Sequence, residues 1–132
     1  MRIGEIAKVT GIDVPTIRFY EQEGLLAEPP RTPGGYRQYR TRDCEVLRFI
    51  RHCRSLDLSL PEIRSLLHYR AHPDLACNEI NELVAAHVEQ VRMRIAQLQE
   101  LELQLLQLQD RCGEHRHAEN CGILHSLSSA GG

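Results

Sequence analysis

The amino-acid sequence predicts a mainly α-helical protein, with a small helical domain over residues 1–73, a long helix over 74–112, and a loop and short helix over 113–132. Two observations carry this prediction. Only two Phe, four Tyr and no Trp occur among 132 residues, so aliphatic side chains must fill the core, which favours helices over an aromatic-rich sandwich. Short apolar-periodic segments come first, and a stretch without Gly or Pro follows from Leu75 to Cys112.

The first two segments predict a pair of short helices. Residues 3–9 place their apolar side chains close to one helical face, and Gly11 then breaks the helix. Asp13 can cap a second helix over residues 14–23, which ends at Gly24. Two short helices joined by a glycine-containing turn predict a helix-turn-helix, although an ordinary helical hairpin would give the same pattern.

The next segment predicts a basic hairpin. In EPPRTPGGYRQYR, residues 28–40, three prolines exclude a helix and two glycines supply a tight turn, after which Tyr36–Arg40 has the pattern of a short strand. Guanidinium groups neutralise phosphates, and phenols donate hydrogen bonds to them. The segment is therefore typical of the wing of a winged DNA-binding domain. A solvated charged loop is the alternative.

Two further helices complete the N-terminal domain. Thr41 or Asp43 caps the first of them, which runs to about Leu56 with an apolar stripe. Ser59 and Glu62 form a capping box at the start of the second.

Charge is distributed unevenly along the chain. Residues 1–56 carry ten Lys or Arg against seven Asp or Glu, a net charge of +3, whereas residues 57–132 carry six against eleven, a net charge of −5. The basic half is the half with the predicted helix-turn-helix, which favours nucleic acid as a partner. The sequence has no secretory or membrane-spanning pattern, so we expect a cytoplasmic protein with no membrane partner.

The long helix predicts dimerisation. A helix from Cys77 to Cys112 would have 36 residues and extend roughly 54 Å, which a domain of about 75 residues cannot cover. Steps of four and three residues define a heptad seam with ten positions, seven of them aliphatic: Ile80, Val84, His87, Val91, Arg94, Leu98, Leu101, Leu105, Leu108 and Cys112. We therefore expect a homodimer. Its polar seam positions, His87 and Arg94, can set register and strand direction.

Three of the five cysteines border the long helix. Cys112 and Cys121 flank a loop and can converge on one ion, but a straight helix holds Cys77 of the same chain roughly 50 Å away. In an antiparallel dimer, Cys77 of one chain would lie beside Cys112 of the other, so three thiolates would meet at each end. Thiolates favour soft ions, and three of them suit lead(II), mercury(II) or cadmium(II) better than a closed tetrahedral zinc site. Burial as small hydrophobic residues is the alternative.

The other potential ligands have ordinary interpretations. We interpret Cys44 and Cys53 as packing residues and the carboxylates of helix 14–23 as solvated surface. Three histidines could add a nitrogen ligand, although solvated side chains are the simpler interpretation: His115, His117 and His125. The sequence shows no nucleophile–base pair, no Gly-rich phosphate loop and no suggestively spaced carboxylate pair, so we expect no enzyme.

Two sets of residues resemble a known family. The segment IGEIAKVTGIDVPTIRFYEQEGLL, followed by GGYRQYR, resembles the N-terminal winged-helix signature of the MerR family of bacterial transcription regulators. FIRHCRSLDLSLPEIRSLL and CGIL resemble its lead- and cadmium-responsive branch, the PbrR and CadR types, and the resemblance extends from Ile3 to about Leu127. It implies a homodimer joined by an antiparallel coiled coil. Such a dimer binds promoter DNA and, with metal, untwists it so that RNA polymerase engages both promoter elements.

The resemblance also implies roles for individual residues. It implies DNA contacts by Thr16, Arg18, Tyr20, Tyr36, Arg37 and Tyr39. It implies metal binding by Cys77, Cys112 and Cys121, with Pb(II) or Cd(II) as the effector and Hg(II) as the nearest alternative. Zinc-sensing relatives usually carry adjacent cysteines after the long helix, so Gly113 after Cys112 weakens Zn(II). A metal-buffering or thiol-redox protein is the alternative of a different class, but it leaves the Arg- and Tyr-rich wing unexplained.

Overall fold

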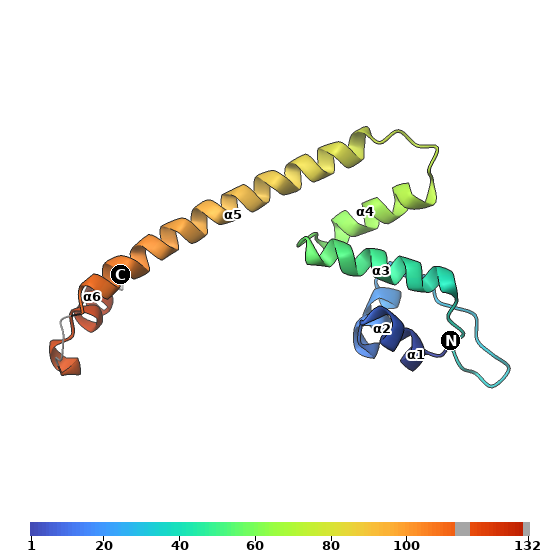
Figure 1. Ribbon diagram of the computed structural model, residues 1–132, viewed down its shortest axis with the longest axis horizontal. Helices are drawn as coiled ribbons and strands as arrows, with labels where there is room; N and C mark the ends of the chain where they lie inside the picture. Colours follow the sequence, from blue (N-terminus) through green and yellow to red (C-terminus); the bar gives the residue numbers. More distant parts are fainter. Residues whose placement is uncertain (113–116, 131–132) are drawn as a thin grey trace. The chain divides into compact units, whose positions relative to one another are not determined.

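The computed structural model describes residues 1–112 and 117–130, which form six α-helices and one 3₁₀ helix (Figure 1). In chain order these are α1 (Ile3–Thr10), α2 (Val14–Gln22), α3 (Thr41–Ser55), α4 (Leu60–Ala71), α5 (Asn78–Asp110), η1 (Ala118–Asn120) and α6 (Gly122–Ala130). The predicted mainly α-helical fold is confirmed. None of the helices described combines the length and the apolar character that crossing a bilayer requires.

The chain divides into two compact units, Met1–Leu83 and Val84–Gly132. In the first unit, α1 packs against both α2 and α3. Aliphatic side chains with no exposed surface form the centre of its core: Ile6, Ile17, Leu47, Ile50 and Ile63. Helix α4 lies along α3, where the Arg70 guanidinium is 5.6 Å from the centre of the Phe49 ring and 3.8 Å from the Glu45 carboxylate.

Local capping explains where the short helices begin and end. Asp13 accepts a hydrogen bond from the Thr16 backbone N–H at 2.9 Å, and hydrogen bonding from Thr16 lowers the pKa of this carboxyl. The predicted capping box is also present, because Ser59 N–H donates to the Glu62 carboxylate at 2.9 Å and Glu62 N–H donates to the Ser59 hydroxyl at 3.3 Å. Gly11 ends α1 with φ of 72°, a left-handed conformation that favours glycine.

The start of α3 differs in detail from the prediction. The cap position is Arg40 rather than Thr41 or Asp43. Asp43 still takes part, because its carboxylate accepts the Arg40 backbone N–H at 2.8 Å from the first turn. Asp43, in the first turn of α3, therefore provides the acceptor for the backbone N–H of the residue that precedes the helix.

The wing, which we define as residues 28–40, is a hairpin without a regular strand. The predicted strand Tyr36–Arg40 is wrong, since one antiparallel bridge, Arg31 to Arg37, is the only pairing among the described residues. Backbone hydrogen bonds from Thr32 to the Tyr36 carbonyl at 2.7 Å and from Gln38 to the Pro30 carbonyl at 2.8 Å hold the hairpin. Prolines in the first arm lack N–H donors, which prevents a continuous ladder.

Helix α5 is a long element with few contacts of its own. Its 33 residues run from Asn78 to Asp110, slightly shorter than the predicted 77–112, and span roughly 50 Å. None of its residues is buried. Several of its exposed apolar side chains lie on the predicted seam: Val84, Val91, Leu98, Leu101 and Leu105.

In the second unit, the start of α6 approaches the end of α5 very closely. A methyl group added at Gly122 would overlap the backbone carbonyl of Arg111. Only glycine allows this approach without a shift of the backbone. The contact therefore brings together two chain segments that immediately adjoin Cys112 and Cys121.

Candidate functional site

A basic groove of about 570 Å³ lies between α1, α2 and the wing. Five cationic residues and one carboxylate residue line it, together with Tyr36 and small or apolar neighbours: Arg2, Lys8, Arg18, Arg31, Arg37 and Glu5. The first helix, the second helix and the wing each contribute cations, so the groove exists only when the three segments fold together. We call it the basic groove below.

The chemistry of the basic groove suits a phosphate backbone. The Arg2 guanidinium stacks over the Tyr36 ring, with 4.1 Å from its central carbon to the ring centre. Tyr36 is 53% exposed, so its phenol can still donate a hydrogen bond outward. Guanidinium, ammonium and phenol groups at one surface are the usual donors to DNA phosphates.

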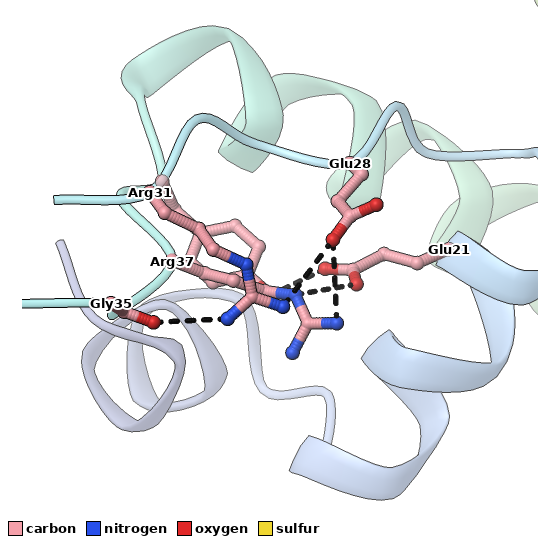
Figure 2. Close-up of polar contacts among 6 residues, drawn as sticks. Glu21, Glu28, Arg31, Gly35 and Arg37 are labelled. Atoms are coloured by element: carbon pink, nitrogen blue, oxygen red, sulfur yellow. Dashed lines mark hydrogen bonds and ion pairs between the residues drawn. The ribbon is translucent and has the colours of Figure 1, made fainter.

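Beside the basic groove, an ion-pair cluster joins the wing to α2 (Figure 2). The Nε atom of Arg37 is 3.2 Å from the Glu21 carboxylate, and its Nη2 atom is 3.7 Å from Glu28. Glu28 is also 3.5 Å from Arg31, which donates to the Gly35 carbonyl at 2.9 Å. Two of the cations that line the basic groove thus lie within ion-pair distance of a carboxylate, and Arg37 contacts the buried one.

The structure brings together three of the six residues that the resemblance assigned to DNA contact. Arg18, Tyr36 and Arg37 line the basic groove. Thr16 is half-buried in the first turn of α2, next to the Asp13 cap. Tyr20 and Tyr39 are only 7% and 2% exposed. Their direct contact with DNA stays a prediction, and their burial favours a supporting part.

The Tyr39 hydroxyl is fixed from within the domain. It donates a hydrogen bond to the Glu21 carboxylate, and burial together with this bond raises the pKa of Tyr39 well above its usual value. The phenol therefore remains a donor throughout the pH range in which proteins bind DNA.

Sequence reasoning missed several residues of this surface. Arg2, Lys8 and Arg31 are absent from the sequence-based assignment; their signal was the concentration of positive charge in the N-terminal half. The interpretation of the α2 carboxylates as solvated surface is wrong for Glu21, whose side chain is 6% exposed and paired. Its partners are 16 and 18 residues away, so no local pattern announces them.

The cysteines proposed as ligands border the two ends of α5. Cys77 directly precedes the helix and is exposed, and Cys112 follows it and is also exposed. Cys121 is half-buried at the start of α6, beside the close approach of Gly122 to Arg111. In the part of the chain that the structure describes, no group of three or more potential ligands forms within one molecule.

The remaining cysteines and histidines have structural surroundings. Cys44 and Cys53 are buried in the core, which confirms their interpretation as packing residues, and burial raises the pKa of the Cys53 thiol. His117 and His125 are exposed, and the His125 ring lies 2.8 Å from the Glu119 carbonyl oxygen. His115 lies outside the described residues.

Two family models match the chain. The model described as "MerR HTH family regulatory protein" matches residues 1–70, and the one described as "MerR, DNA binding" matches residues 44–108. The matched ranges contain the basic groove, the ion-pair cluster and most of α5.

Individual relatives are similar over nearly their whole length. The transcription regulator PbrR691 from Ralstonia metallidurans CH34, solved in complex with lead(II), is 48% identical with a TM-score of 0.86, over 96% of this chain and 98% of that one. MerR from Bacillus megaterium MB1, solved in complex with mercury(II), is 30% identical with a TM-score of 0.72, over 97% and 99%. The HTH-type transcriptional regulator ZntR of Escherichia coli K12 is 40% identical over 128 residues, which cover 96% of this chain and 91% of that protein.

Proposed function

The chain belongs to the MerR family of helix-turn-helix regulatory proteins, and we propose that it activates heavy-metal resistance genes when Pb(II) or Cd(II) binds it on a promoter. It is a DNA-binding transcription regulator that responds to heavy metals, and the family is not one of enzymes.

The DNA-binding part of the proposal rests on the basic groove. Five cationic residues from α1, α2 and the wing face one surface with a single carboxylate among them. Arg18 and Arg37 contact phosphates or base edges in this proposal, Tyr36 donates to a phosphate, and Thr16 fixes the start of α2, which would be the helix that reads the DNA. Tyr20 and Tyr39 support that surface from inside the domain.

The metal-binding part rests on three thiols at the ends of α5. Exposed or half-buried thiols are accessible to a soft ion, and the Gly122 contact brings the segments of Cys112 and Cys121 together. Cys77 precedes a helix of 33 residues, so it joins them only from a second chain that runs antiparallel. Bound metal would supply three bonds to thiolates, which tie the end of one chain to the other.

The single observation that carries the proposal is that α5 has no buried residue along its whole length. It exposes a row of aliphatic side chains and is bordered at both ends by the proposed ligands. A homodimer covers the apolar row and completes the thiol set at the same time. The similarity to PbrR691 supports lead as the effector, because that protein was solved with lead(II) and is 48% identical.

The proposed route from the thiols to DNA starts at the position of Cys77 in the chain. Cys77 lies between α4 of the DNA-binding unit and α5. When a metal ion ties Cys77 to the partner's thiols, the displacement of Cys77 is passed to α4, which is part of the DNA-binding unit. Two such units on one duplex transmit their tilt to the DNA, whose bending and untwisting cost on the order of a few kcal/mol. RNA polymerase then engages both promoter elements.

A competitive metal titration tests the proposal. Purified dimer is titrated with Pb(II), Cd(II), Hg(II) and Zn(II) while thiolate-to-metal absorption is followed. We expect Pb(II) or Cd(II) to bind most tightly, with a stoichiometry of one ion per three thiolates. Cys77→Ser should lose most of the thiolate-to-metal absorption. Cys53→Ala is the matched control, because Cys53 is buried in the core, and it should retain the signal. Equal affinity of Cys77→Ser and the unaltered protein contradicts the proposed site.

Mercury(II) is the second candidate effector. The chain is 30% identical to a MerR protein solved with mercury(II), and three thiolates suit that ion as well. The same titration separates the two, since a preference for Hg(II) over Pb(II) and Cd(II) favours this second candidate. A metal-buffering protein would bind the same metals through the same thiols, but that function would not explain the basic groove.

A further inference from the structure

We propose that Glu21 is a positioning residue that locks the wing onto α2, so that both reach DNA as one preformed surface. This inference rests on the proposed DNA-binding function and deepens it. Glu21 itself does not line the basic groove and, as an anion, would repel phosphate. Glu21 would act on DNA binding indirectly, by holding Arg37 and Tyr39 in position.

The geometry of Glu21 is that of a bridge. One carboxylate oxygen accepts the Tyr39 hydroxyl, and the other lies 3.2 Å from Nε of Arg37. The two partners stand on either side of Gln38 in the second arm of the wing. A single side chain of α2 thus holds this arm at two points.

The burial of Glu21 distinguishes this bridge from a surface ion pair. Its side chain is 6% exposed, and a buried carboxylate is costly unless it is paired and hydrogen-bonded. If the wing leaves α2, Glu21 loses both partners at once. Undocking of the wing thus breaks a buried ion pair and a hydrogen bond together.

The wing needs such a bridge because its own pairing is slight. Its arms share one isolated β-bridge and a few backbone hydrogen bonds, and outside the hairpin Tyr39 pairs with Met1 through two backbone hydrogen bonds of 2.7 and 2.8 Å. Two-stranded hairpins are marginally stable in water by themselves. A flexible wing would lose conformational entropy each time it bound DNA, and Glu21 removes that cost in advance.

Glu28 provides a contrast within the same cluster. It is 3.7 Å from Arg37 and 3.5 Å from Arg31, but its side chain is 62% exposed. Exposed ion pairs contribute little because water and salt screen them. Glu21→Gln and Glu28→Gln remove the same charge near the same arginine, and only Glu21→Gln removes a buried bridge.

Hydrogen exchange measured by mass spectrometry tests the inference on the full-length dimer. In Glu21→Gln the introduced side-chain amide can still accept from Tyr39, but its NH₂ group cannot pair with Arg37. We expect amides of residues 30–40 to exchange roughly tenfold faster in this variant, since the ion pair between Arg37 and a buried carboxylate is lost. Residues 41–71 should be unchanged, and Glu28→Gln should change the wing by about twofold or less.

DNA binding supplies the second readout, with a duplex selected by the unaltered protein from a random-sequence pool. Removal of an anion near DNA should by itself strengthen binding. Glu28→Gln should therefore bind equally or more tightly, whereas Glu21→Gln should bind several-fold more weakly. Tyr39→Phe, which keeps the ring and the Arg37 pair, should lie between Glu21→Gln and the unaltered protein.

Each outcome decides the inference. Unchanged wing exchange in Glu21→Gln overturns it, and so does faster exchange spread equally over residues 1–71, which would mean that Glu21 only stabilises the fold. Stronger DNA binding by Glu21→Gln overturns it as well. If the unaltered protein selects no duplex, the proposed function fails, but wing exchange still tests whether Glu21 docks the wing.

Discussion

Arg18 is the residue of α2 that lines the basic groove. It is exposed on α2 and lines the groove together with wing residues. We expect Arg18→Ala to weaken binding to the selected duplex and to leave metal affinity unchanged. Loss of one phosphate contact should lower the magnitude of the log–log salt slope by about one.

A mobility-shift series at several salt concentrations measures this effect. Arg92→Ala is the matched control, because Arg92 is 71% exposed on α5 and pairs only weakly with Glu89 at 3.6 Å. The control should keep the affinity and the slope of the unaltered protein. An unchanged affinity for Arg18→Ala would remove α2 from the DNA-binding surface.

Single residues of this surface could be predicted only where they belong to a local motif. The resemblance assigns Arg18, Tyr36 and Arg37 to DNA contact, and the structure places all three on the basic groove. The burial of Tyr39 was not predictable, because side chains alternate between buried and exposed faces only along a regular strand, and no strand forms in the wing. The bridge by Glu21 joins residues distant in sequence, which a pattern within one helix cannot reveal.

At the scale of elements, α5 offers two overlapping seams. The predicted seam passes through His87 and Arg94. The exposed aliphatic residues Val88 and Ile95 lie directly beside these two, and they are 41% and 48% exposed. A seam through Val84, Val88, Val91, Ile95 and Leu98 keeps the steps of four and three residues and is entirely aliphatic. Between residues 84 and 98, burial of apolar surface favours this second seam, whereas beyond Leu98 the same steps reach Glu102 and the predicted seam continues through Leu101.

The prediction is that Ile95→Gln weakens the dimer more than Arg94→Gln does. Each Ile buried at the interface contributes about 1.5–3 kcal/mol, so Ile95→Gln should raise the dimer dissociation constant at least tenfold. Sedimentation equilibrium measures this constant, and Met93→Gln serves as a control for a polar change at a neighbouring exposed position. If Arg94→Gln weakens the dimer more than Ile95→Gln does, the dimer interface follows the predicted seam through His87 and Arg94.

The elements themselves were largely predictable, because their boundaries are set by local chemistry. The Asp13 cap, the capping box of Ser59 and Glu62, and the glycine end of α1 all occur as the sequence indicates. The strand predicted in the wing does not form. Prolines in the first arm lack the N–H donors that a ladder needs, and the Tyr39 N–H bonds to the Met1 carbonyl rather than to the facing arm.

At the scale of the whole molecule, the account predicts that each metal site contains thiols from both chains. A heterodimer of Cys77→Ser with a Cys112→Ser, Cys121→Ser chain should have one complete site, because the intact Cys77 of the second chain faces the intact pair of the first. Its other end should have none. Each mutant homodimer should lack a three-thiol site at both ends.

Isothermal titration with Pb(II) measures these stoichiometries. The heterodimer, purified with two different affinity tags, should bind tightly at half the stoichiometry of the unaltered dimer. Weak binding by the heterodimer, equal to that of the two homodimers, would show that the thiols do not converge across an antiparallel dimer.

The central claim is that metal changes the shape of bound DNA rather than its occupancy. On this claim, the basic groove and α2 would keep their DNA contacts in both states, and metal would shift the population between two bound geometries. In-vitro transcription from a cognate promoter, run together with footprinting, tests this claim most directly. The account predicts equal protection with and without Pb(II), new hypersensitivity at the operator centre with Pb(II), and transcript only when Pb(II) is present. Release of the protein from DNA on addition of Pb(II), with transcription rising as protection disappears, would contradict it.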